Sequence, residues 1–247
     1  MKIIINLIIF LTGWTLWSQN ATEIIRKSDK NIRGTSSYAE ISIKIVRPKW
    51  QREMRLKNWS KGDDYAVSII TYPAKEKGIV FLKRKNEMWN YMPVIKRKIK
   101  MPPSMMLQSW MGTDLTNDDL VKQSSMVKDY THKIVGEETI QGLKTWKIQL
   151  TPKEEAPVVW GKILVWIDQK DYMQMKVEFY DEDGFLVNKM LSYEPKNFNG
   201  HKLPARLEFI PVDKPGQKTV IIYKQLKFDI PVDNKLFSPN YMTRIKI

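Results

Sequence analysis

The feature that most constrains this fold is an alternation of apolar and polar residues with a period of two. It is clearest over 39–45, 143–150, 173–180 and 203–210, where every second residue is apolar. Such alternation is typical of strands that bury one face. Further strands are expected over 50–59, 64–72, 78–84, 87–92, 95–101, 129–138, 161–168, 185–194 and 218–228. Short glycine-containing turns separate these strands, which predicts an antiparallel sheet of about a dozen strands, curled into a barrel or half-barrel.

Helical patterns are few. Ala21–Ile32 has apolar residues at helical spacing and precedes Gly34, a typical helix end. A second helix is predicted over Ser104–Met111, after two prolines and before Gly112, and Thr116 and Asp119 have the spacing of a capping box. The expected fold class is therefore mainly β, with an N-terminal helix and a mid-chain helical lid.

The N-terminus has the layout of a secretory signal. Lys2 precedes the uncharged, largely apolar run Ile3–Trp17, and Ser18 follows. The run is shorter than the ~20 residues that a spanning helix needs, although a membrane anchor or a buried strand remains an alternative. We predict a signal peptide over 1–18 and, because no linker or repeat divides the rest, a single domain over 19–247.

The charge and the missing cysteines limit the partners. Lys and Arg number 41 against 27 Asp and Glu, a net charge of +14, which fits nucleic acid, an anionic membrane surface or an acidic partner. Export and the lack of a nucleic-acid-binding motif argue against nucleic acid. The absence of Cys excludes disulfides, zinc–thiolate sites and a lipid-modified N-terminal cysteine. We therefore expect an exported protein without a lipid anchor.

The sequence contains no recognisable catalytic motif. The only histidines, His132 and His201, lie far apart in the chain, and we interpret both as structural. Adjacent carboxylates occur at 63–64 and at 118–119, but neighbouring side chains diverge on a strand or at a helix start. We therefore expect no enzyme activity, no metal site and no cofactor.

Two apolar groups are candidates for ligand binding. The chain has 13 Met and 9 Trp, and flexible Met side chains can repack around ligands of variable shape. The first group is the face of the predicted lid helix, formed by Met105, Met106, Leu107, Trp110 and Met111. The second is one side of a strand, formed by Met173, Met175, Val177 and Phe179. Filling of the core is the alternative for both groups, and the sequence does not reveal which sheet face lines a cavity.

The basic segment 94–101 has two interpretations. Its lysines alternate with apolar residues, as in a solvated edge strand that resists aggregation. The same pattern would suit a rim that contacts anionic lipid headgroups.

Four short segments carry a resemblance to a known family. They are 109–120, 179–184, 199–204 and 236–239. In order and spacing the chain resembles the outer membrane lipoprotein-sorting proteins of the LolA-like group. The resemblance implies an incomplete β-barrel covered by helices, with an apolar cavity for acyl chains.

It also implies a periplasmic carrier that takes acyl chains of lipoproteins, or another lipid, from an inner-membrane transporter to an outer-membrane acceptor. Transient contact with the membrane surface would accompany this role. A non-catalytic adaptor of an envelope transporter of the resistance-nodulation type is the main alternative. An envelope hydrolase is a third, for which the sequence offers no convergent catalytic set.

Overall fold

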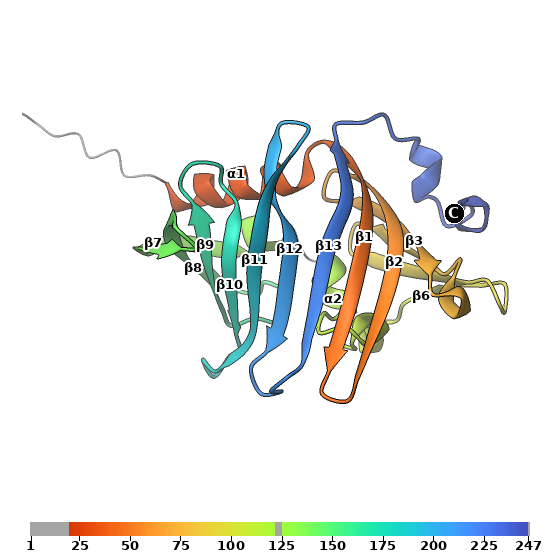
Figure 1. Cartoon of the computed structure of the whole chain (residues 1–247), viewed down its shortest axis with the longest axis horizontal. Helices are drawn as coiled ribbons and strands as arrows, with labels where there is room; N and C mark the ends of the chain where they lie inside the picture. Colours follow the sequence, from red (N-terminus) through yellow and green to blue (C-terminus); the bar gives the residue numbers. More distant parts are fainter. Residues whose placement is uncertain (1–19, 122–124, 247) are drawn as a thin grey trace, which may run out of the picture.

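Among the described residues, 20–121 and 125–246, thirteen strands form one antiparallel sheet in the computed structural model (Figure 1). The expected signal peptide, 1–18, lies outside the described residues. The strands are β1 (Ser36–Arg47), β2 (Trp50–Lys61), β3 (Tyr65–Tyr72), β4 (Val80–Arg84), β5 (Glu87–Met92), β6 (Arg97–Lys100), β7 (Tyr130–Ile140), β8 (Leu143–Pro152), β9 (Lys162–Asp168), β10 (Gln174–Tyr180), β11 (Leu186–Phe198), β12 (His201–Pro211) and β13 (Lys218–Phe228). Each overlaps one of the predicted strands, so the alternation predicted the positions of the strands correctly.

The order of the strands explains where the lid lies. It runs β6-β5-β4-β3-β2-β1-β13-β12-β11-β10-β9-β8-β7, so consecutive strands are neighbours and β1 pairs with β13 in the middle. The sheet is curved but its edge strands, β6 and β7, do not pair with each other, which confirms the expected half-barrel. Because β6 and β7 are opposite edges, the chain between them must cross the sheet. We call the described part of this connection, 101–121 and 125–129, the lid.

The N-terminal helix, α1 (Ala21–Arg33), forms as predicted. Asn20 caps its start by accepting a hydrogen bond from the Thr22 amide at 2.9 Å, and Gly34, at a φ of 59°, ends it. The helix lies across one face of the sheet (Figure 1). Ile24 and Ile25 are buried there among residues of β7, β8 and β9.

The lid differs from its prediction. The continuous helix expected over 104–111 is wrong: the segment forms two 3-10 turns, η2 (Pro103–Met105) and η3 (Trp110–Gly112). Met111 and Gly112 have positive φ values, 52° and 76°, and this left-handed backbone cannot continue an α-helix. Helical structure follows later, in α2 (Asn117–Val121) and α3 (Ser125–Lys128).

The remaining short helices are η1 (Ala74–Glu76), η4 (Asn234–Phe237) and η5 (Met242–Arg244). Phe237 and Met242 pack against Val67 and Leu82. These strand residues alternate with Ser68 and Phe81, so the C-terminal segment covers the face of β3 and β4 that is turned away from the lid.

Candidate functional site

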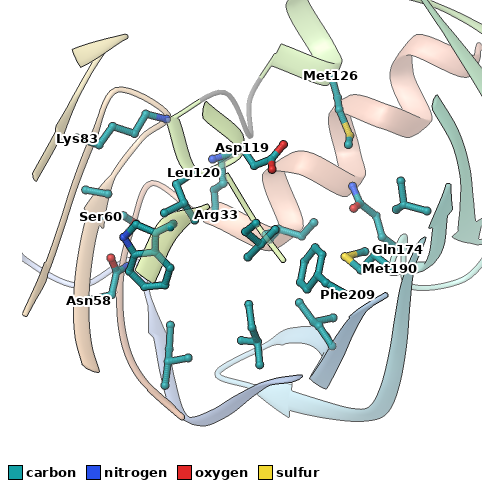
Figure 2. Close-up of a pocket in the computed structure, with 18 of the residues that line it drawn as sticks. Arg33, Asn58, Ser60, Lys83, Asp119, Leu120, Met126, Gln174, Met190 and Phe209 are labelled. Carbon is teal, nitrogen blue, oxygen red and sulfur yellow. The ribbon is translucent and has the colours of Figure 1, made fainter. Parts of the chain in front are cut away.

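A cavity of about 390 Å³ lies between the concave face of the sheet, α1 and the lid (Figure 2). This size is within the range usual for small-molecule sites. The sheet contributes its floor, α1 contributes Asp29, Ile32 and Arg33, and the lid contributes Trp110, Leu115 and the helices that follow. The cavity is therefore assembled from segments that are far apart in the sequence.

One end of the floor is mostly apolar. Ile163, Val177, Phe179, Met190, Leu207, Phe209 and Ile221 line it from β9 to β13. Gln174 and Asn188 are polar, but no described lining residue of these strands is charged. Met190 and Phe209 lie together at this end in Figure 2. Side chains at every second position face the cavity, which is the direct consequence of the alternation in the sequence.

Of the four strand candidates, two line the cavity and two do not, because β10 is irregular between them. Val177 and Phe179 line the cavity, whereas Met173 and Met175 do not, although both are fully buried. The register of β10 against β9 shifts between Gln174 and Lys176, and a bulge of this kind reverses which residues face the cavity. Gln174 therefore lines the cavity in place of the two methionines. A strict period of two could not reveal this shift.

The lid candidates also divide. Trp110 is buried, lines the cavity and packs edge-on against Phe81 of β4, with 5.3 Å between ring centroids. Met106 and Met111 pack against the core cluster that includes Trp110. The other two candidates, Met105 and Leu107, are 39% and 62% exposed, because the turns around them do not form the expected apolar helix face. Of the five lid candidates, only Trp110 lines the cavity; Met105, Met106, Leu107 and Met111 do not.

An ion pair fixes the lid to the floor. Arg47, at the end of β1, contacts both carboxylate oxygens of Asp114 in the lid, with Nη1–Oδ2 at 3.1 Å and Nη2–Oδ1 at 3.0 Å. Thr219 of β13 donates to the same carboxylate at 2.7 Å, and Arg47 also donates to the Gly112 carbonyl. Only 12% of the Arg47 side chain and 8% of the Asp114 side chain are exposed. Forked, shielded contacts of this type are the strong class of ion pair.

A second set of hydrogen bonds shapes the lid itself. The predicted capping pair is confirmed: the Asp119 amide donates to the Thr116 hydroxyl, and the Asp119 carboxylate accepts from the Thr116 amide at 2.8 Å. Asn117 donates to the carbonyls of Met105 and Gln108. Burial raises the pKa of Asp119, which lines the cavity, and its hydrogen bonds to Thr116 and Trp160 partly offset this effect.

The other end of the cavity is polar and carries charges of both signs, because Asp29 and Asp63 line the cavity as well as Arg33 and Lys83. Asn58, Ser60 and Lys83 lie on this side in Figure 2, across from Gln174, Met190 and Phe209. Arg33, at the last turn of α1, reaches the same region. The sequence analysis missed Arg33, Arg47, Lys83 and Asp114. For Lys83 a signal existed, because it is in phase with the inward-facing Phe81 on the same strand.

Both histidines fasten α1 to the sheet. His132 of β7 contacts the Thr22 hydroxyl through Nδ1 at 3.0 Å and the Met126 carbonyl through Nε2 at 2.7 Å. His201 of β12 contacts the Asn31 carbonyl at 2.9 Å and stacks on Phe228. Within the described ranges, no cluster of three or more His, Asp or Glu side chains is arranged to hold a metal ion.

In the part of the chain that the structure describes, no helix combines the length and apolar character needed to cross a membrane.

Comparisons with known proteins identify the fold. A family model described as uncharacterized protein-like matches residues 62–244, more than half of the chain. Among curated proteins, none matches. A solved DUF1329 family protein from Desulfovibrio piger has a TM-score of 0.82 at 22% identity, over 90% of this chain and 97% of that one.

Two further solved structures are similar over comparable lengths. An outer membrane lipoprotein-sorting protein domain from Vibrio parahaemolyticus has a TM-score of 0.78 at 21% identity, over 91% of this chain and 98% of that one. A LolA superfamily protein from Nitrosomonas europaea has a TM-score of 0.75 at 25% identity, over 90% and 99%. The similarity therefore extends over nearly the whole length of these relatives.

Proposed function

We propose that the chain, which belongs to the uncharacterized family whose model matches residues 62–244 and has the fold of LolA-like outer membrane lipoprotein-sorting proteins, is a periplasmic carrier. It sequesters the acyl chains of lipoproteins, or of another lipid, in its cavity and transfers them between the inner and the outer membrane. The observation that carries this proposal is the cavity of about 390 Å³ between a mostly apolar floor and the lid. In this role the protein is a binder and not an enzyme.

The energetics of the floor suit an acyl chain. Each CH₂ group removed from water contributes about 0.8 kcal/mol, so a carrier needs apolar area more than specific polar contacts. Val177 and Phe179 of β10 and Leu207 and Phe209 of β12 supply such area. Trp110 and Leu120 of the lid add apolar surface to the cavity lining. The nine sequence candidates take different roles here, since only Trp110, Val177 and Phe179 would contact the ligand directly.

Loading and release require the lid to move. The Arg47–Asp114 pair joins the lid to β1 by polar contacts. A polar attachment can break and reform in water at a smaller cost than a packed core. We expect the lid to open by separation of this pair while the sheet stays intact.

The turn between β5 and β6 suits a transient contact with a membrane. Val94 and Ile95 are 87% and 56% exposed at its tip. Basic residues from Lys96 to Lys100 follow directly, and Lys96, Arg97 and Lys98 are exposed. Exposed apolar side chains beside cations favour an anionic membrane surface. At such a surface the carrier would meet an inner-membrane transporter or an outer-membrane acceptor.

The adaptor alternative predicts a filled interior, so an open cavity favours the carrier. The two hypotheses separate in a binding experiment with N-phenyl-1-naphthylamine, an uncharged apolar fluorophore. The carrier binds it in the cavity, and Leu207→Asp, which places a charge on the apolar floor, reduces the affinity at least tenfold.

Phe185→Asp is the matched control, because Phe185 is 70% exposed and does not line the cavity. This variant should bind like the wild type. Absence of binding to the wild type, or equal losses in both variants, would contradict the proposal. Circular dichroism of both variants verifies that the fold is retained.

A further inference from the structure

The two ends of the cavity differ in chemistry, and the polar end contains hydrogen-bond donors that lack acceptors. It is formed by two cross-strand rows on β1 to β4. The first row pairs Lys83 with Ala66, Ser60 and Ser37, and the second pairs Phe81 with Ser68, Asn58 and Ala39. All eight residues line the cavity. The row that contains Lys83 has only small side chains beside the lysine, so space remains in front of it.

Lys83 is the central cation of this end. Its side-chain ammonium makes no hydrogen bond or ion pair within the described ranges 20–121 and 125–246, although it is largely shielded from solvent. Burial, together with the nearby Arg33, lowers the pKa of Lys83 to about 8, although the surrounding Asp carboxylates partly oppose this shift. Two cations thus face the same space and repel one another.

The neighbouring acids do not neutralise Lys83. Asp29 accepts from the Nε of Arg33 at 2.7 Å, and Asp63 pairs with Lys128 at 2.5 Å. Asp64 is exposed at the turn before β3. Asp29 and Asp63 are therefore engaged by other cations and Asp64 is turned to solvent, although all three still attract Lys83. Asp119, which also lines the cavity, accepts hydrogen bonds from Thr116, and the ammonium of Lys83 keeps its capacity to bind an anion.

Other donors at this end are also available. The contact of Arg33 with Asp29 uses Nε, and the two terminal nitrogens have no hydrogen bond to a described residue. The indole Nε1 of Trp110 is buried and has no acceptor among the described residues, although Trp110 is only 4% exposed. Trp110 packs on Phe81, two residues from Lys83 on β4. A buried donor without an acceptor is costly, which indicates that a ligand supplies the acceptor.

We infer that this end of the cavity binds the phosphate or carboxylate headgroup of an anionic acyl lipid. The anionic oxygens accept hydrogen bonds from Lys83 and Arg33 and relieve the repulsion between them. The Trp110 indole donates to the same headgroup or to an oxygen near it. The acyl chain extends from there over the apolar end of the floor. This inference rests on the proposed carrier function and specifies its cargo as an anionic amphiphile.

The test compares ligands that share one chain and differ in the head. Hexadecyl phosphate, hexadecanoate and hexadecanol each displace N-phenyl-1-naphthylamine from the purified protein, and inorganic phosphate is a fourth competitor. We expect the two anionic ligands to bind at least tenfold more tightly than hexadecanol, the difference expected for hydrogen bonds to charged groups. Inorganic phosphate, which lacks the chain, should bind far more weakly.

Variants connect this preference to Lys83. Lys83→Gln removes the charge and should abolish most of the preference while hexadecanol binds as before. Lys83→Arg keeps the charge and should retain the preference. Lys98→Gln, at an exposed lysine on β6, is the control and should behave like the wild type.

The outcomes separate this inference from the carrier proposal. Equal binding of all three hexadecyl ligands, or a preference that survives in Lys83→Gln, would overturn the headgroup site and leave the carrier intact. Failure of every hexadecyl ligand to bind would contradict the carrier itself. If inorganic phosphate bound as tightly as hexadecyl phosphate, the site would be one for free anions and the assignment to a lipid would be wrong.

Discussion

The floor and the lid of the cavity are built on different principles. The floor is a sheet of thirteen hydrogen-bonded strands, and its inward side chains are fixed by the register of their neighbours. The lid consists of short turns and two short helices, attached to the floor by the Arg47–Asp114 pair, by Thr219 and by the packing of Trp110. This difference indicates that the cavity opens at the lid, because opening at the floor would break the strand pairing and unfold the protein.

The largest effect is expected in the floor. Leu150 of β8 is fully buried in the core cluster under α1. Leu150→Ala should lower the free energy of unfolding by about 2–5 kcal/mol, since it removes packed methyl groups and leaves a void. Urea denaturation measures this change. Val212→Ala, at a residue that is 43% exposed, should cost far less, and equal losses in the two variants would contradict the assignment of the core.

An intermediate and local effect is expected at the lid. Arg47→Met leaves the shielded Asp114 carboxylate without its cation, which favours opening of the lid. Amide hydrogen exchange over 110–119 should accelerate about tenfold or more, while amides in β8 and β9 keep their protection.

Arg55→Met provides the control for this experiment. Arg55 pairs with Glu53, but 58% of its side chain is exposed, so its loss should leave the exchange of the lid unchanged. Acceleration spread over the whole sheet in Arg47→Met would show that the lid and the floor form one cooperative unit.

The smallest effect concerns the attachment of α1. Burial lowers the pKa of His132, so the unfolded chain takes up this proton at a higher pH than the folded protein. Stability from this group is therefore present above the ordinary pKa of histidine and decreases as the pH falls below it. Denaturation of the wild type between pH 7 and 5 should show a steeper loss than that of His132→Gln. Equal slopes would exclude this contribution.

The sequence predicted the floor well because one physical rule governs it. A strand buried on one face must alternate, and the alternating residues Ala39, Ile41 and Ile43 of the predicted strand share one face and line the cavity. The rule fails at β10, where the register shifts at Met175. As a result Gln174 lines the cavity, and Met173 and Met175 do not. Bulges depend on pairing with the neighbouring strand and leave no clear local signal.

The lid was harder to predict because its conformation depends on distant contacts. Met105 and Leu107 have the composition of an apolar helix face, yet positive φ values at Met111 and Gly112 reverse the chain. Arg47 and Asp114 lie 67 residues apart in the sequence, and only the folded sheet brings them together. Lys83 was not among the sequence candidates, and lysine usually lies at the surface.

The most direct test of the account is a reversible link between the lid and the floor. The chain has no cysteine, so within one molecule Cys replacements at Asp114 and Thr219, whose side chains are in contact, have no other thiol to pair with, and oxidation of the dilute protein favours this link. The measurement is the rate of N-phenyl-1-naphthylamine uptake by this double variant, first oxidised and then reduced. We expect oxidation to slow uptake at least tenfold and reduction to restore it. Equal rates in the two states would contradict entry beneath an opening lid, and no uptake in either state would contradict the carrier function.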